Sequence, residues 1–273
     1  MAVRTKFPLQ ESDFADLREV MRKYVIPGYA PKEPFLDRTG AVISMGSCFA
    51  QNIHRTLTAA SIPSAWLNLS ETINTPPFAL VTMQALRGLD TSLIGHMPPN
   101  VLTDEGLAAA RALLPTAQAF ILTLGVAMQP FHEDGKPTFH ISKSGYHGTN
   151  WRLLTVDEVL NYTRSIINSI RAMKPGIPVV VTLSPIPVTN SVGHESVFGQ
   201  DCESKSILRV AIMHLMEEAI PDVYYWPSFE VVRWVSGHMR PFFGGVGAFD
   251  MRHISSTLLT TIMEVFIEAY FKP

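Results

Sequence analysis

Cysteine and charge are both scarce in this sequence of 273 residues. Its two cysteines, Cys48 and Cys202, are too few for a disulfide framework and too far apart for a CxxC metal site. Charged residues make up 17% of the chain, below the share of about a quarter that is typical of soluble domains. The formal net charge is −2 and no basic cluster occurs, so we expect no nucleic-acid partner.

Long apolar runs and phosphate-binding loops are also missing. No segment approaches the length of a membrane span, and the opening "MAVRTKFPLQESDFADLREV" has no apolar h-region of a signal peptide. We therefore expect no membrane partner and a cytoplasmic protein, in agreement with the low cysteine content. No glycine-rich dinucleotide or phosphate motif is present.

Strands alternate with helices along most of the chain. The segments 41–46 ("AVISMG") and 119–125 ("AFILTLG") have the continuous hydrophobicity of strands buried on both faces of a parallel sheet. The other expected strands are 61–69, 177–185 and 222–228, and the expected helices are 48–60, 156–173, 204–220, 254–271 and one that follows the prolines of 73–86. This order predicts an α/β fold: a three-layer α/β/α sandwich with a mainly parallel, flavodoxin-like sheet.

The first 39 residues differ in composition from the rest. We expect a short helix over 11–25 and then an irregular arm, because "IPGYAPKEPF" holds three prolines. Residues 1–39 are thus predicted as a helix and arm, and residues 40–273 as the α/β domain. The sequence leaves the role of the arm and the oligomeric state open.

Ser47 lies where a buried strand passes into a helix, in "AVISMGSCFAQNIHRTL". The simplest interpretation is a tight turn that needs Gly46 and small neighbours. The alternative is a nucleophile, because helix-end N–H groups can stabilise negative charge on a bound oxygen. The carboxyl ends of parallel strands meet at one edge, so Gly125, Ser184 and the segment after Trp226 should gather near Ser47.

A serine nucleophile needs a base, which a carboxylate orients. In "GAFDMRHISS", Asp250 and His253 are three residues apart, after the last expected strand. Both can face one pocket, with the carboxylate on one ring nitrogen and the other nitrogen toward Ser47. Equally, Asp250 could cap a turn and His253 could be an ordinary surface residue. The spacing alone does not decide.

Six blocks of the sequence resemble a known family. "MGSCFAQNI" resembles the signature of the GSCFA family, which lies within the GDSL/SGNH hydrolases, and "ILTLG", "TLSPIPVT", "SKSILRVAI", "YYWPSFE" and "DMRHIS" resemble its further blocks in order. The resemblance runs from about residue 40 to 265. It implies an SGNH-hydrolase-like domain over 40–273, with Ser47 as nucleophile and Asp250 and His253 as the closing Asp-x-x-His block.

The strand end at Gly125 departs from that wider group. There the group usually has Gly-x-Asn-Asp, whose Asn helps to bind the oxyanion, whereas Ala127 stands at the Asn position here. The remaining donors would be backbone N–H groups near Ser47 and Gly125 and the side chain of Asn74 in "INTPPF". Asn74 could instead be only a turn residue ahead of Pro76.

Three further features have plainer interpretations. Cys48 is expected in the core, because neighbouring helix positions point about 100° apart, and Ser204 is expected to cap a helix. His132, His140 and His147 follow no metal-ligand pattern, so their loop is interpreted as an insertion that shapes the substrate site. Ser184 is expected to line the cleft.

The sequence therefore predicts a serine esterase with a Ser47–His253–Asp250 triad, no metal and no cofactor. The resemblance implies a small acyl ester as substrate, with O-acetyl groups on carbohydrates as a common theme. Two alternatives stay open. One is an O-acyltransferase that uses the same acyl-serine. The other is a binding protein on a degenerate hydrolase scaffold, which the missing amide at Ala127 would favour.

Overall fold

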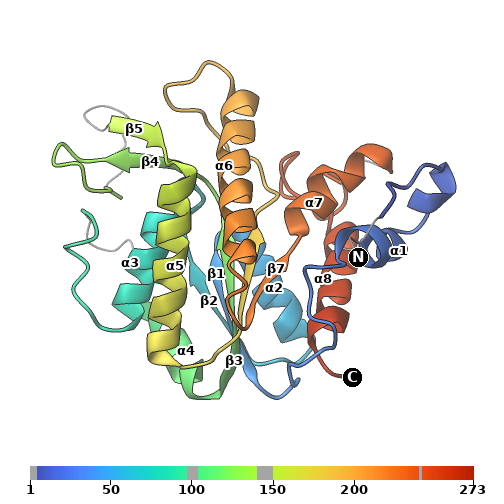
Figure 1. Cartoon of the computed structure of the whole chain (residues 1–273), viewed down its shortest axis with the longest axis horizontal. Coiled ribbons are helices and arrows are strands. Elements are labelled where there is room, and N and C mark those ends of the chain that lie inside the picture. The colour runs from blue at the N-terminus through green and yellow to red at the C-terminus, as the bar shows by residue number, and fades with distance from the viewer. Residues whose placement is uncertain (1–4, 97–103, 140–149, 240–241) are drawn as a thin grey trace.

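Five parallel strands form the central sheet of the computed structural model, which describes residues 5–96, 104–139, 150–239 and 242–273 (Figure 1). Their spatial order is β2–β1–β3–β6–β7. The strands are β1 (Ala41–Gly46), β2 (Ser64–Asn68), β3 (Ala117–Leu124), β6 (Val179–Leu183) and β7 (Val223–Trp226). Counted within the sheet, this is the flavodoxin-like order 2-1-3-4-5. The predicted fold class is confirmed.

The three inner strands are apolar because both of their faces are covered. Every residue of β1 and β6, and all but one of β3, is buried. The register pairs Ile43 of β1 with Ala65 and Phe120 on its two sides. Such strands lack the alternating pattern of half-exposed strands, and for this reason the sequence could identify them.

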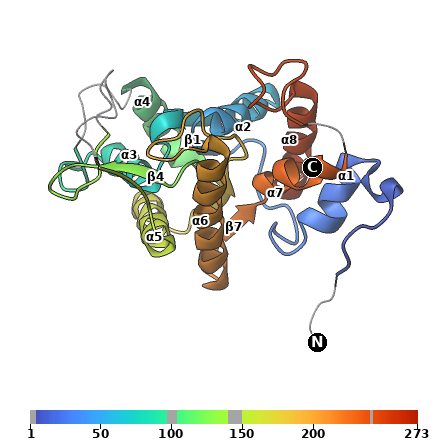
Figure 2. The ribbon, with the colours of Figure 1, turned by 90° about the horizontal axis from the view of Figure 1, so that it is seen from above.

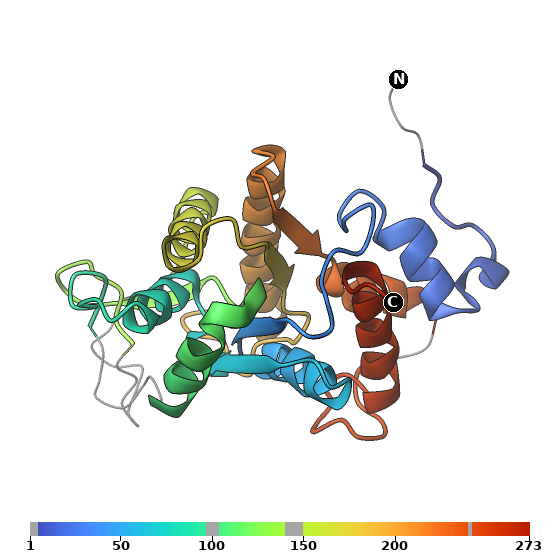
Figure 3. The same cartoon turned by 90° about the horizontal axis from the view of Figure 1, so that it is seen from below.

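Two layers of helices cover the sheet, and each belongs to its own hydrophobic cluster. On one face lie α3 (Pro76–Leu86), α4 (Asp104–Leu113), α5 (Val156–Met173) and α6 (Val197–Glu217). On the other lie α1 (Leu17–Val20), α2 (Cys48–Ala59), α7 (Ser228–Arg233) and α8 (Ser256–Tyr270). Figure 3 shows strands between α5 and α6 on one side and α2 on the other.

Two helix boundaries test the sequence signals. Helix α5 has the predicted bounds, because Thr155 and Glu158 form a capping box at its start. Helix α6 begins at Val197, capped by the Ser196 hydroxyl, which accepts from the Gly199 N–H at 3.0 Å. The prediction that Ser204 caps this helix is therefore wrong, since Ser204 lies two turns inside it.

The N-terminal residues pack against the last helix. The predicted helix over 11–25 is divided into a 3₁₀ turn, η1 (Glu11–Phe14), then α1, then a π turn, η2 (Met21–Val25). Figure 2 shows this segment beside α7 and α8. The arm ends where Leu36 forms a bridge with Phe271.

The remaining elements lie around the carboxyl end of the sheet and in its connections. The strands β4 (Met128–Phe131) and β5 (Asn150–Leu153) form a separate antiparallel pair that the sequence did not predict. The short helices η3 (Glu71–Ile73), η4 (Leu114–Thr116) and η5 (Val235–His238) complete the structure. In the described parts of the chain, no helix is long and apolar enough to cross a membrane.

Candidate active site

Ser47 lies at the turn between β1 and α2. Gly46 has φ +146°, and a Cβ atom there would lie 2.7 Å from the Cβ atom of Thr123, so the turn requires glycine. Ser47 is the N-cap residue of α2, but its hydroxyl makes no capping hydrogen bond. The side chain is therefore available for another partner, although the residue is only 5% exposed.

That partner is Asn74, which donates from Nδ2 to the Ser47 Oγ at 3.1 Å. Asn74 is buried, and its backbone carbonyl accepts from the Val126 N–H at 2.9 Å. A Cβ atom at Gly125 would overlap the Asn74 amide, so the glycine is what lets this side chain reach Ser47. Asn74 also precedes the N-cap residue of α3, Thr75. Asn74 is thus the turn residue ahead of Pro76, and its side chain also contacts Ser47; its role as an oxyanion donor stays a prediction.

Asp250 and His253 form a hydrogen-bonded pair in the loop before α8. The His253 Nδ1 atom lies 2.7 Å from the Asp250 Oδ1. This bond, together with the Arg252 N–H and guanidinium, lowers the pKa of Asp250 to about 2. The carboxylate is therefore ionised at neutral pH and can only accept, which places the proton on Nδ1 and leaves Nε2 to face the site.

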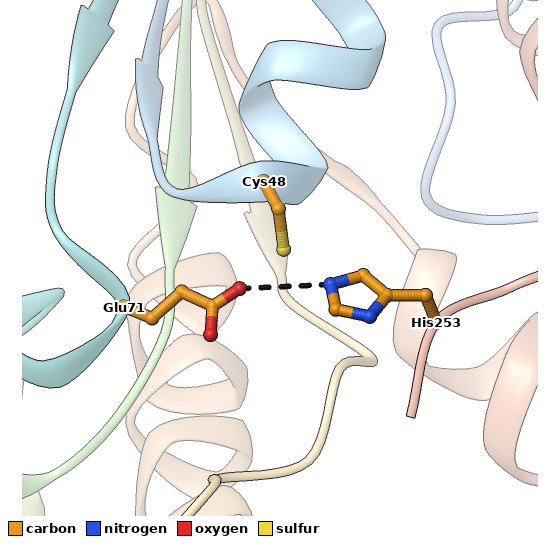
Figure 4. A group of neighbouring side chains, drawn as sticks. All are labelled: Cys48, Glu71 and His253. Carbon is orange, nitrogen blue, oxygen red and sulfur yellow. Dashed lines mark ion pairs between the residues drawn. The ribbon is translucent and has the colours of Figure 1, made fainter. Parts of the chain in front are cut away.

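The structure does not join this pair to Ser47. Nε2 of His253 lies 3.6 Å from Oε1 of Glu71, a residue of η3 (Figure 4). Among the described residues, no hydrogen bond connects His253 with Ser47. Glu71 also approaches the Arg252 guanidinium at 3.5 Å. His253 thus lies between two carboxylates, and the serine has its own separate partner.

The prediction that Cys48 points into the core is wrong. Its side chain lines the cavity next to Ser47 and lies near Glu71 and His253 (Figure 4). The 100° rule applies between two helical residues, but Ser47 is a cap with φ −83° and ψ −147°. Burial and the Glu71 carboxylate raise the pKa of Cys48 to about 12. The thiol is therefore neutral and a poor nucleophile at neutral pH.

Two groups of side chains among the described residues have the donor chemistry for a metal. Donor atoms of Cys48, Glu71 and His253 lie within 4.8 Å of one another, and all three residue types bind zinc. The exposed residues His96, His132 and Asp134 form the second group, with His96 Nε2 at 2.9 Å from Asp134 Oδ2. His140 and His147, which the sequence pairs with His132, lie outside the described residues.

A small cavity next to Ser47, Cys48 and Glu71 holds about 80 Å³, which is room for on the order of six water-sized groups. Of the predicted site residues, Ser47, Asn74, Gly125 and Ser184 line it. The Ser184 hydroxyl accepts from the Ile186 N–H at 3.4 Å. Apolar lining comes from Val126, Met128, Trp151, Ile186, Val188 and Val192.

Helix α6 contributes Gln200, Ser204 and Lys205 to the cavity lining, and the sequence predicted none of them there. Lys205 is 2% exposed and donates from Nζ to the Gly125 carbonyl at 2.6 Å. Ser204 accepts from the Ala127 N–H at 2.7 Å. The signal was present in the sequence: the apolar stripe of Leu208 and Leu215, continued backward at helical spacing, falls on the last two of these polar residues.

The fold and its buried serine place this chain among α/β proteins whose site lies at the carboxyl end of a parallel sheet. The chain belongs to the GSCFA family, whose model matches residues 100–266, more than half of its length. The predicted family is confirmed. The matched range includes Lys205, Asp250 and His253. None of the curated proteins compared with the chain matches it.

Several solved structures are similar in fold. A chain from Streptococcus pneumonia, provisionally described as a platelet activating factor, has 14% identity, a TM-score of 0.47, and coverage of 94% of this chain and 90% of its own. The salicylyl-acyltransferase SsfX3 from a tetracycline biosynthetic pathway has 11% identity and a TM-score of 0.45, with coverage of 86% of this chain and 55% of its own. A carbohydrate esterase family 3 protein from Talaromyces cellulolyticus has 11% identity and a TM-score of 0.41, with coverage of 85% of this chain and 94% of its own. With TM-scores below 0.5, these similarities bear on neither activity nor substrate.

Proposed function

We propose that this protein is a serine esterase of the GDSL/SGNH type, with Ser47, His253 and Asp250 as its triad. One observation carries the proposal. A buried serine at a strand-to-helix turn receives a side-chain amide rather than capping its own helix. The Asp250–His253 pair lies beside the same cavity, where His253 contacts the cavity-lining Glu71.

In the first step the Ser47 oxygen forms a bond to the acyl carbon, and the carbonyl electron pair moves onto its oxygen. His253 takes the serine proton on Nε2, while Asp250 holds Nδ1–H and stabilises the imidazolium. For this step Nε2 must exchange Glu71 for Ser47. Catalytic hydrogen bonds are often long in unliganded sites and close in the substrate complex.

The negative oxygen then needs donors. Asn74, whose Nδ2 donates to the Ser47 Oγ, would supply one donor, and the N-terminus of α2 would contribute N–H groups and its dipole. When the tetrahedral intermediate collapses, the bond to the alcohol breaks and His253 returns the proton to the leaving oxygen. Water then cleaves the acyl-serine by the same steps in reverse.

The substrate that fits is a small acyl ester, since the cavity has room for only about six water-sized groups. The family resemblance favours an O-acetyl ester on a carbohydrate. The reaction would need neither a metal nor a cofactor, and we place it in the cytoplasm. If a hydroxyl of an acceptor replaces water, the same acyl-serine makes the protein an O-acyltransferase.

The proposal is tested with p-nitrophenyl acetate and a fluorophosphonate probe. Ser47→Ala and His253→Ala should abolish turnover, Cys48→Ala should retain most of it, and mass spectrometry should find the adduct on Ser47. Products formed only in the presence of an alcohol would identify the transferase. A wild-type protein that neither turns over nor labels would contradict both enzymes and support the binding protein.

A further inference from the structure

Lys205 is a buried cation that the triad does not use. A buried charge is costly unless it is paired or hydrogen-bonded. Among the described residues, no carboxylate forms an ion pair with Lys205. Asp201, one turn earlier on α6, pairs with Arg233 and accepts from the Val188 N–H at 3.0 Å. Burial lowers the pKa of Lys205 to about 8. Such a lysine in a cavity is more typical of a functional site than of a scaffold.

Within the described parts of the chain, Lys205 makes one hydrogen bond, and it is made to the site. The ammonium donates to Gly125, and its neighbour Ser204 accepts from Ala127. Two consecutive residues of α6 thus hold both ends of the segment 125–127. The middle residue, Val126, donates to the backbone carbonyl of Asn74. Helix α6 therefore supports the segment against which Asn74, the partner of Ser47, packs.

The same segment lacks the amide that the wider hydrolase group carries there. Ala127 has no side-chain donor, and its N–H is already given to Ser204. An ammonium has three donors, of which Lys205 uses one for Gly125. The ammonium keeps its positive charge, and Lys205 lines the same cavity as Ser47, Asn74 and Gly125.

We propose that Lys205 replaces the missing amide at position 127: its ammonium fixes the Gly125 segment behind Asn74 and stabilises the oxyanion electrostatically. The inference rests on the proposed function, because it assumes that an oxyanion forms at Ser47. In this scheme Lys205 positions the Gly125 segment and adds its charge, without contacting the reacting atoms. Its loss should lower kcat rather than raise KM, since the charge it stabilises exists only in the transition state.

The test compares Lys205→Met, Lys205→Arg and a matched control, Lys174→Met. Lys174 also donates from Nζ to a main-chain carbonyl next to β3, that of Pro115 at 2.7 Å, but at the opposite end of the strand. With neutral p-nitrophenyl acetate, Lys205→Met should lower kcat by roughly 10- to 1000-fold and leave KM within about threefold. Lys205→Arg should restore much of kcat, and Lys174→Met should match the wild type.

The pH profile separates charge from mere packing. As the lysine loses its proton, wild-type kcat should fall with a midpoint near pH 8, and in Lys205→Arg this alkaline fall should be displaced to higher pH because arginine stays charged. If Lys205→Met does not fold, this pair of profiles still decides.

A wild type that labels at Ser47, with unchanged kcat in Lys205→Met, overturns the inference alone. The same holds if the profile of Lys205→Arg coincides with that of the wild type, or if the loss falls on KM only. A wild type that neither turns over nor labels overturns the proposed function, and the inference with it.

Discussion

The two ends of β3 carry the same bond in different surroundings. At the amino end, Lys174 donates to the carbonyls of Leu114 and Pro115 from a half-buried position. At the carboxyl end, Lys205 donates to Gly125 from full burial. The first ammonium keeps part of its water, whereas the second has lost it. The same hydrogen bond therefore joins a hydrated charge to the strand at one end and a buried charge at the other.

The polar residues of the sheet divide in the same way. Ser47, Asn74 and Ser184 at the carboxyl end are each at most 5% exposed and line the cavity. At the amino end of β2, Ser64 is half-buried and bonds His54 Nδ1 at 2.8 Å. Buried polar groups that face one cavity indicate a site, whereas a polar pair near the surface indicates local structure.

Removing the serine hydroxyl at each end should give the largest contrast. Ser47→Ala should lower kcat for p-nitrophenyl acetate by about 10⁴-fold or more, because no other group can form the acyl-enzyme. Ser64→Ala should leave kcat unchanged and cost about 1 kcal/mol of stability. Steady-state kinetics and thermal unfolding measure both. Equal activity in the two variants would remove the distinction between the ends.

A methyl group added to a glycine at each end should give the next contrast. In Gly125→Ala the new Cβ displaces the Asn74 amide, so kcat should fall by roughly 100- to 1000-fold. Gly176, which precedes β6, has φ +72° and open space around it. Gly176→Ala should therefore cost about 1–2 kcal/mol in unfolding free energy and spare kcat. A Gly125→Ala protein with full activity would show that Asn74 is not needed.

Lys205→Met should lose activity without losing stability. Burial lowers the pKa of Lys205 from its ordinary value of 10.5 to about 8 in the folded protein, so its charge opposes folding. This penalty, roughly 3 kcal/mol, is complete below pH 8 and fades as the pH rises toward 10.5. The variant escapes it but leaves the Gly125 carbonyl without a donor, at about 1–3 kcal/mol.

Unfolding at pH 7 and pH 10 measures the outcome. We expect Lys205→Met to equal or exceed the wild type at pH 7 and to lose ground by pH 10. For Lys174→Met the difference from the wild type should stay the same at both values. A large loss of stability at pH 7 in Lys205→Met alone would make that lysine structural.

The smallest effect is expected at Glu71. Its carboxylate is 38% exposed and lies 3.6 Å from His253, and exposed ion pairs contribute only about 0–1 kcal/mol. Glu71→Gln should release His253 and change kcat by at most about fivefold, upward. Asp37→Asn, which breaks the exposed pair with Lys272, is the control at the far end of the sheet. A loss of tenfold or more would make Glu71 part of the machinery.

The sequence predicted the layers of the fold well because buried strands and helix faces are rich in apolar residues. Strands such as β6 are buried along their whole length and almost entirely apolar. Helix α5 has a capping box at its start and Pro175–Gly176 just after its end. The start of α6 was missed because its first turns contain Gly199 and polar residues, and so lack a clear apolar stripe. The hairpin of β4 and β5 was missed because Pro130 lies inside it, and proline usually argues against a strand.

The site was predicted less completely, since it depends on approach across the fold. Ser47, Asp250 and His253 lie in local motifs, so the sequence could propose them as candidates. The approach of His253 Nε2 to Glu71 depends on η3, which lies far away in the chain. Cys48 was misplaced because a helix rule was applied to a cap. Lys205 was overlooked because a charged residue on a buried helix face contradicts the ordinary pattern.

The alkylation rates of the two thiols of the chain can be compared in one sample. Cys202 is exposed, whereas Cys48 lies in the wall of the cavity with its pKa raised to about 12. An alkylating reagent should therefore modify Cys202 quickly and Cys48 slowly. Any molecule that occupies the cavity should slow the second reaction and spare the first. The chain thus carries its own reporter of occupancy, with an internal reference in the same sample and no label to introduce.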